Sequence, residues 1–212
     1  MREVDASKTK RAVAFELWMN ASNPMVTFFK TMDISNIVKL SKKFHCKLNM
    51  LMCWCVGKTA SQIKEFYLLP VENKLIKYDK IAVDVVVKTK NGEIRSCDIP
   101  FSGSLKRFNH DYLKLTKKVF YSCKNYNLEQ DYMIIGTSAL VKYDIEGAVN
   151  IYAGFYNNPF MIWGRYKRSF LKKLLTVSFQ FHHTQMDGID AAKFLELLQK
   201  EIKNVSRETF KT

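Results

Sequence analysis

The apolar residues of the first third of the chain recur every three or four positions, which is the period of an α-helix. This spacing predicts helices at residues 8–18, 34–43 and 49–63, with a short strand at 25–30 between the first two. Ser7 is expected to cap the first helix and Asp33 the second. The helix at 49–63 is apolar on most faces, so we expect it to be buried.

From residue 66 onward the pattern is mostly that of strands. Strands are predicted at 66–71, 74–78, 80–88, 132–139, 148–154, 160–165 and 174–181. A helix is predicted at 102–122, a polar loop at 125–130 and a final helix at 190–204. Because strands and helices are interleaved without strict alternation, we predict an α/β fold of the α+β kind with one large mixed β-sheet.

The composition places the chain among folded domains rather than disordered or fibrous proteins. Its 212 residues are 47% hydrophobic and 25% charged, which suits a single domain over residues 1–212 with a substantial core. The longest apolar stretch, at residues 48–57, is too short to span a bilayer, and residues 2–10 do not begin a signal peptide. We therefore expect a cytoplasmic protein with no membrane partner.

The charge is strongly basic, with 34 Lys and Arg against 20 Asp and Glu, a net +14. Most of the basic residues are dispersed lysines, so we do not expect nucleic acid as a partner. The densest basic patch consists of Arg165, Lys167, Arg168, Lys172 and Lys173. Two interpretations of this patch stay open, a solvated hairpin turn and an anion-binding surface.

The five cysteines are an odd number, without a CxxC motif and without the spacing to histidine that metal sites need. They are expected to be reduced thiols, and Cys46, Cys53 and Cys55 belong to the apolar segment around the buried helix. We expect no disulfide framework, no metal and no prosthetic group.

The candidate chemistry lies at the end of the last predicted strand, where His182 and His183 are adjacent. Neighbouring side chains of a strand point to opposite faces, so the two imidazoles cannot share one role. An imidazole with an ordinary pKa of ~6.5 is a natural general base near neutral pH. Asp187, four residues later, either orients that base, holds the loop or caps the final helix.

The segment from His182 to Gly188 matches the HHxxxDG signature of the coenzyme A-dependent acyltransferases. Three further segments, in the right order, resemble the chloramphenicol acetyltransferase family: residues 10–15, 136–140 and 163–166. The chain resembles that family over nearly its whole length. The resemblance implies a two-layer sandwich, acetyl-CoA as co-substrate, a small hydroxylated acceptor, and a homotrimer with its active sites at the subunit interfaces.

The resemblance also implies residue roles. His183 would be the general base, held in its tautomer by its own main-chain carbonyl, and His182 would point into the packing. Ser138 would donate to the oxyanion, although without the resemblance a buried strand serine bonded to backbone is the simpler interpretation. Asp187 would form a supporting ion pair with Arg11.

The acceptor pocket resembles the family less closely than the catalytic residues do. Leu17 and Trp18 would form its walls, and Ile162 stands where the family has a threonine. Tyr166 and Arg165 would contact the coenzyme. Three functions therefore remain in order of preference: acetylation of chloramphenicol, as in antibiotic resistance; the same transfer to another hydroxylated acceptor; and binding of a ligand or anionic partner without turnover.

Overall fold

The computed structural model describes residues 1–150, 152, 154–206 and 208–210. Its strands are β1 (Arg2–Val4), β2 (Met25–Asp33), β3 (Leu68–Val71), β4 (Lys74–Lys77), β5 (Ile81–Lys88), β6 (Ile94–Pro100), β7 (Met133–Ala139), β8 (Phe160–Trp163), β9 (Lys167–Ser169) and β10 (Lys172–His182). Its α-helices are α1 (Ala12–Trp18), α2 (Ser35–Lys43), α3 (Leu48–Ala60), α4 (Leu105–Ser122) and α5 (Gly188–Asn204), with short 3₁₀ turns at Ala6–Lys8, Lys64–Tyr67 and Glu208–Phe210.

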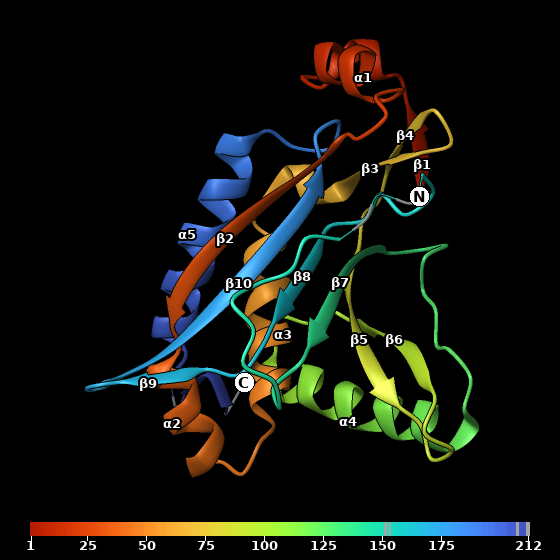
Figure 1. Cartoon of the computed structure of the whole chain (residues 1–212). Coiled ribbons are helices and arrows are strands. Elements are labelled where there is room, and N and C mark those ends of the chain that lie inside the picture. Colours follow the sequence, from red (N-terminus) through yellow and green to blue (C-terminus); the bar gives the residue numbers. More distant parts are fainter. Residues whose placement is uncertain (151, 153, 207, 211–212) are drawn as a thin grey trace.

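The large sheet has the order β2-β10-β8-β7-β5-β6, with β9 paired to the start of β10. It is mixed, because β10 runs antiparallel to β2 and β8 while β7 runs parallel to β8 and β5. A separate small sheet has the order β1-β4-β3 and lies toward the end of the molecule that carries α1 (Figure 1). The predicted large mixed sheet is confirmed.

Helices α3, α4 and α5 cover one face of the large sheet, which makes the fold two-layered (Figure 1). The β10 residues Val177, Phe179 and Phe181 are buried in a core shared with α3 and α5. Because strand side chains alternate, Ser178 points to the opposite face, which we call the outer face. The prediction that the third helix is buried is confirmed, since ten of its residues are buried.

One predicted strand is absent, and one strand was not predicted. Residues 148–150, 152 and 154 form no strand, and residues 151 and 153 lie outside the described part of the chain. Asn150 instead contacts the outer face from a loop, where its carbonyl accepts a bond from Gln180 at 3.1 Å. Strand β6 was missed because its outward residues, including Ser96 and Asp98, are polar and disguise the pattern.

The predicted caps also differ. Asp5, not Ser7, caps the first 3₁₀ turn, and α1 begins only at Ala12. Asp33 ends β2, and its carboxylate accepts a bond from the backbone of Ser35 at 3.0 Å, so it stabilises the start of α2 from one position further out. Among the described residues, no helix is both long enough and apolar enough to cross a membrane.

Candidate active site

Strand β10 ends at His182, and His183 begins the turn that leads directly into α5. The backbone of His183 donates to the carbonyl of Pro24 at 2.8 Å, which ties this turn to the chain before β2. The residues 182–187, which we call the catalytic turn, therefore sit where β10, α5 and the N-terminal segment meet.

His182 is fully buried, and burial together with the neighbouring His183 lowers its pKa to about 4. Its Nδ1 accepts a bond from the backbone of Thr184 at 3.1 Å, and its ring lies edge-on to Tyr152. This imidazole stays neutral at physiological pH and braces the turn. The expectation that His182 points into the packing is confirmed.

His183 faces the other way and is 27% exposed. Its ring stacks on the indole of Trp18, with centroids 4.7 Å apart and planes 12° apart. Its Nδ1 is buried without a hydrogen-bond partner among the described residues, and the nearest carboxylate oxygen, Oδ1 of Asp187, is 3.5 Å away. Trp18 thus contacts the candidate base itself.

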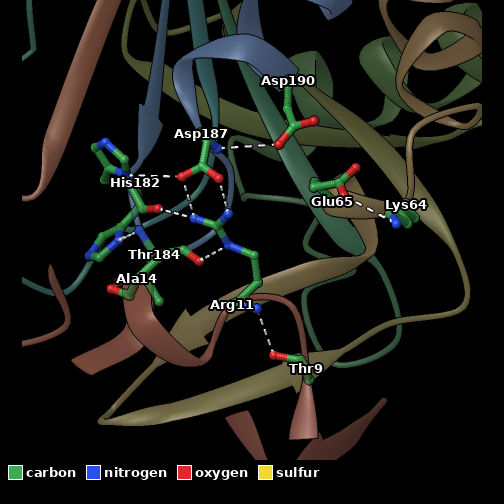
Figure 2. A network of polar contacts seen from close by, with 10 residues as sticks. Thr9, Arg11, Ala14, Lys64, Glu65, His182, Thr184, Asp187 and Asp190 are labelled. Carbon is green, nitrogen blue, oxygen red and sulfur yellow. Dashed lines mark hydrogen bonds and ion pairs between the residues drawn. The ribbon is translucent and has the colours of Figure 1, made fainter. Parts of the chain in front are cut away.

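Arg11 holds the catalytic turn from below, and only 5% of it is exposed (Figure 2). Its Nη1 and Nη2 donate to the two carboxylate oxygens of Asp187 at 2.6 and 3.0 Å. Nη2 also donates to the carbonyl of His183 at 2.6 Å, and Nε to the carbonyl of Thr184 at 2.9 Å. The carbonyl that was expected to orient the imidazole therefore accepts a bond from Arg11. The expected ion pair between Arg11 and Asp187 is present as a bidentate contact, the strongest form of this pair.

Asp187 also begins α5, where it is part of a capping box with Asp190. The hydrogen bonds from Arg11 lower the pKa of Asp187, so its carboxylate stays ionised. Two interpretations left open by the sequence, loop holder and helix cap, therefore apply together.

Gln185 is a residue of the turn that the sequence did not single out. It is fully buried, and its Nε2 donates to the carbonyl of Leu68 at 2.6 Å, where β3 begins. The sequence did contain a signal, which is a polar amide inside the HHxxxDG segment. A buried amide must find a hydrogen-bond partner, so Gln185 could have been expected to tie the turn to another segment.

Ser138 and Ile162 lie elsewhere, in the middle of the sheet. The parallel register of β7 and β8 pairs Ser138 with Ile162, and the register of β8 and β10 pairs Ile162 with Ser178. All three therefore point to the outer face. The serine and the isoleucine are therefore neighbours on that face.

The same register sets the distance between Ser138 and His183. His183 is five residues past Ser178, about 17 Å along the strand, and Ser138 is two strand spacings away, about 10 Å. Their Cα atoms are thus about 19 Å apart within one chain. A single copy does not bring the candidate base and the candidate oxyanion donor together.

The remaining candidates divide between these two regions. Leu17 lies one residue before Trp18 in α1 and is 63% exposed, so in one copy it encloses nothing. Arg165 and Tyr166 follow β8 and line a small cavity of about 90 Å³ with Asn49 and Met52. Arg165 donates to the carbonyl of Lys142. No group of three or more His, Cys, Asp or Glu side chains suited to a metal occurs in the described part of the chain.

Comparison with known proteins gives a consistent result along the whole chain. A family model described as chloramphenicol acetyltransferase matches residues 1–199. Chloramphenicol acetyltransferase 2 of Escherichia coli is 23% identical over 211 residues, covering 95% of this chain and 97% of the relative. Chloramphenicol acetyltransferase 3 of Escherichia coli is 22% identical over 204 residues, covering 92% and 94%.

Solved structures show the same fold. A chloramphenicol acetyltransferase superposes with a TM-score of 0.84 at 16% identity, covering 95% of this chain and 99% of that one. A probable dihydrolipoamide acetyltransferase from Listeria monocytogenes reaches a TM-score of 0.72 at 12% identity, covering 98% and 97%. The two-layer acyltransferase fold expected from the signature is confirmed.

Proposed function

The chain belongs to the chloramphenicol acetyltransferase family, and we propose that it is an acetyl-CoA-dependent O-acetyltransferase whose active site is shared between two subunits of a homotrimer. Family membership supports acyl transfer from acetyl-CoA. The acceptor, the assembly and the roles of individual residues are our proposals.

One observation carries the proposal. The base-bearing turn is fully built in a single chain, whereas Ser138 lies about 19 Å away on the outer face. A donor can stabilise an oxyanion only from about 3 Å. If both residues act in one reaction, His183 of one subunit must face Ser138 of its neighbour, as in a cyclic assembly of identical chains.

The reaction begins with the acceptor hydroxyl against Nε2 of His183. That nitrogen accepts the hydroxyl proton while the oxygen attacks the carbonyl carbon of the acetyl thioester. Nδ1 must carry the other proton, and the negative charge of Asp187 at 3.5 Å favours this tautomer. Trp18 and Arg11 keep the ring and its backbone in place, so little reorganisation is needed.

The attack forms a tetrahedral intermediate with a negative oxygen, to which the hydroxyl of Ser138 donates. Collapse breaks the carbon–sulfur bond, and the leaving thiolate takes the proton from the imidazolium of His183. The products are the acetyl ester of the acceptor and the free thiol of coenzyme A, and His183 returns to its neutral form without a covalent acyl-enzyme.

Arg165 and Tyr166 are our candidates for the coenzyme wall, since they line a cavity beside the strand that carries Ile162. A cation and an aromatic ring suit phosphate and adenine.

The five cysteines are free thiols, which supports a reducing compartment such as the cytoplasm.

Chloramphenicol is the acceptor we propose first, and another hydroxylated acceptor is the second candidate. The specific reason for the second is Ile162, which places an apolar side chain beside Ser138 where the family resemblance implies a hydroxyl. Loss of a polar contact there changes which acceptor is preferred more than it changes the base.

The test is release of coenzyme A thiol from acetyl-CoA with chloramphenicol present. Acceptor-dependent release that falls about 10²- to 10⁴-fold in His183→Ala supports both the activity and the base. His110→Ala, which changes an exposed histidine of α4, is the matched control and should retain full activity.

Equal release by the wild type and His183→Ala would exclude chloramphenicol as substrate, and a panel of hydroxylated acceptors would follow. No acceptor-dependent release of coenzyme A thiol with any acceptor of that panel would contradict an acetyltransferase and favour a family member that only binds its ligand.

A further inference from the structure

The hairpin between β9 and β10 ends in two fully presented apolar side chains. Phe170 is 96% exposed and Leu171 is 80% exposed. The pairing of Ser169 with Lys172 makes these two residues the whole turn. Figure 1 shows the hairpin projecting from the body of the molecule beside α2. A convex apolar tip of this kind is unusual on a soluble surface.

The backbone of this tip is also unfavourable for the residues it contains. Phe170 has a φ of 45°, in the left-handed region. Two-residue hairpin turns favour glycine at such a position, because a side chain there is strained. A strained and exposed phenylalanine contributes little to folding, which indicates that it is kept for contact with something outside the chain.

Cations surround the tip on both faces of the hairpin. Arg168 is directly opposite Lys173, an arrangement of like charges that destabilises a strand pair. Lys172 lies on the other face. Among the described residues none of these three forms an ion pair, whereas Lys167, at the base, pairs with Asp144 at 3.4 Å and with Glu146.

We propose that this hairpin docks the protein peripherally on an anionic lipid surface. Phe170 and Leu171 enter the boundary between headgroups and acyl chains, and Arg168, Lys172 and Lys173 contact lipid phosphates. A protruding tip matches a deformable bilayer, whereas a protein partner would have to provide a pocket for it. This contact does not span the membrane, and it departs from the expectation of no membrane partner.

The experiment is sedimentation of the full chain with vesicles of phosphatidylcholine, either alone or mixed with phosphatidylglycerol. We expect binding only to the mixed vesicles, with an affinity that falls as salt rises. Phe170→Ser combined with Leu171→Ser should weaken binding at least about tenfold. Arg168→Ser combined with Lys172→Ser should weaken it about 30-fold and flatten the salt dependence.

The matched control is Lys114→Ser combined with Lys117→Ser, which removes the same charge from the exposed face of α4. It should bind within about twofold of the wild type, because general attraction of a basic protein is not enough. As a second readout, Phe170→Trp should be quenched by brominated lipid in the mixed vesicles.

Three results would overturn the proposal. The first is equal vesicle binding by the wild type and the apolar double variant. The second is a change in sedimenting mass of that variant without lipid, which would assign the tip to contact between copies. The third is an increased KM for acetyl-CoA with vesicle binding intact, which would assign it to the coenzyme site.

Discussion

The catalytic turn and the strands that carry Ser138 solve the same problem, the placement of a reactive side chain, in different ways. His183 is placed by side chains that reach across the chain, with Arg11 alone donating to Asp187 and to two carbonyls of the turn. Ser138 is placed by strand register, which depends on the backbone. Removal of one side chain should therefore disturb the structure of the catalytic turn, whereas removal of the Ser138 side chain should reduce catalysis and leave the fold intact.

The two regions also treat buried charge differently. In the turn, the guanidinium of Arg11 lowers the pKa of Asp187. On the outer face beside β7, Asp84 and Asp98 are opposite each other on β5 and β6, and in the described part of the chain neither forms an ion pair. Burial raises the pKa of Asp98 to about 7. The charge of the turn is compensated and that of the outer face is not.

The largest effect on stability is expected from Arg11→Ala. Its removal leaves two carbonyls and one carboxylate without their donor, so the free energy of unfolding should fall by about 3 kcal/mol. Urea unfolding at fixed protein concentration measures this, and acetyl transfer should fall with it. Lys10→Ala is the neighbouring control and should cost less than about 0.5 kcal/mol. A stable but inactive Arg11 variant would mean that Arg11 acts in the chemistry rather than through the turn.

Ser138→Ala should show the opposite separation. We expect kcat to fall about 10²-fold, because one oxyanion donor is lost, with the KM for acetyl-CoA and the melting temperature nearly unchanged. Steady-state kinetics and thermal unfolding of the same preparation test this. A drop in stability with normal kcat would show that the hydroxyl is a structural partner of the strand.

Asp98→Asn should change how stability depends on pH. The pKa of Asp98 is raised in the folded state, so the folded state holds the proton and stability falls as pH rises from about 4 to about 7. The free energy of unfolding of the asparagine variant, relative to that of the wild type, should therefore increase by about 2 kcal/mol from pH 5 to pH 8. Unfolding curves of both proteins at the two pH values measure this. A difference in free energy of unfolding that is the same at pH 5 and pH 8 would contradict an uncompensated carboxyl.

The effect of Asp187→Asn has the reverse sign and is smaller, because the carboxylate is half exposed. Its lowered pKa stabilises the folded state above the unfolded pKa near 4, and that contribution disappears as pH falls further. The variant should be about 1 kcal/mol less stable at pH 7 and equal to the wild type near pH 2. A difference that persists at pH 2 would assign the effect to the helix cap instead.

The same contrast explains what the sequence could predict. Local strand alternation was enough to predict different roles for His182 and His183, although the strand ends at His182 and His183 lies in the turn. The signature and the family resemblance pointed to Arg11 and Asp187, yet no spacing rule connects residues 176 positions apart. The stacking of Trp18 on His183 and the buried amide of Gln185 depend on tertiary packing and were not predicted.

The two errors in the predicted strands have a related cause. Strand β6 directs Ser96 and Asp98 to the outer face, so its pattern is polar. Its edge is nevertheless paired by the backbone of Tyr126, and Asp98 is buried and accepts a bond from the backbone of Leu128. The apolar segment predicted as a strand at 148–154 has the opposite character, because its described residues 148–150, 152 and 154 form no strand, although Asn150 contacts Gln180 of the sheet. Hydrophobic patterns report burial and do not tell which element provides it.

The central claim is that the base and the oxyanion donor come from different copies of the chain. Purified His183→Ala and Ser138→Ala proteins, each nearly inactive, can be unfolded together, refolded and assayed. If the site is shared, random mixing restores about a quarter of wild-type activity, because that share of the interfaces pairs an intact His183 with an intact Ser138. Activity no higher than the sum of the two separately refolded variants, in oligomers shown to contain both chains, would contradict the account.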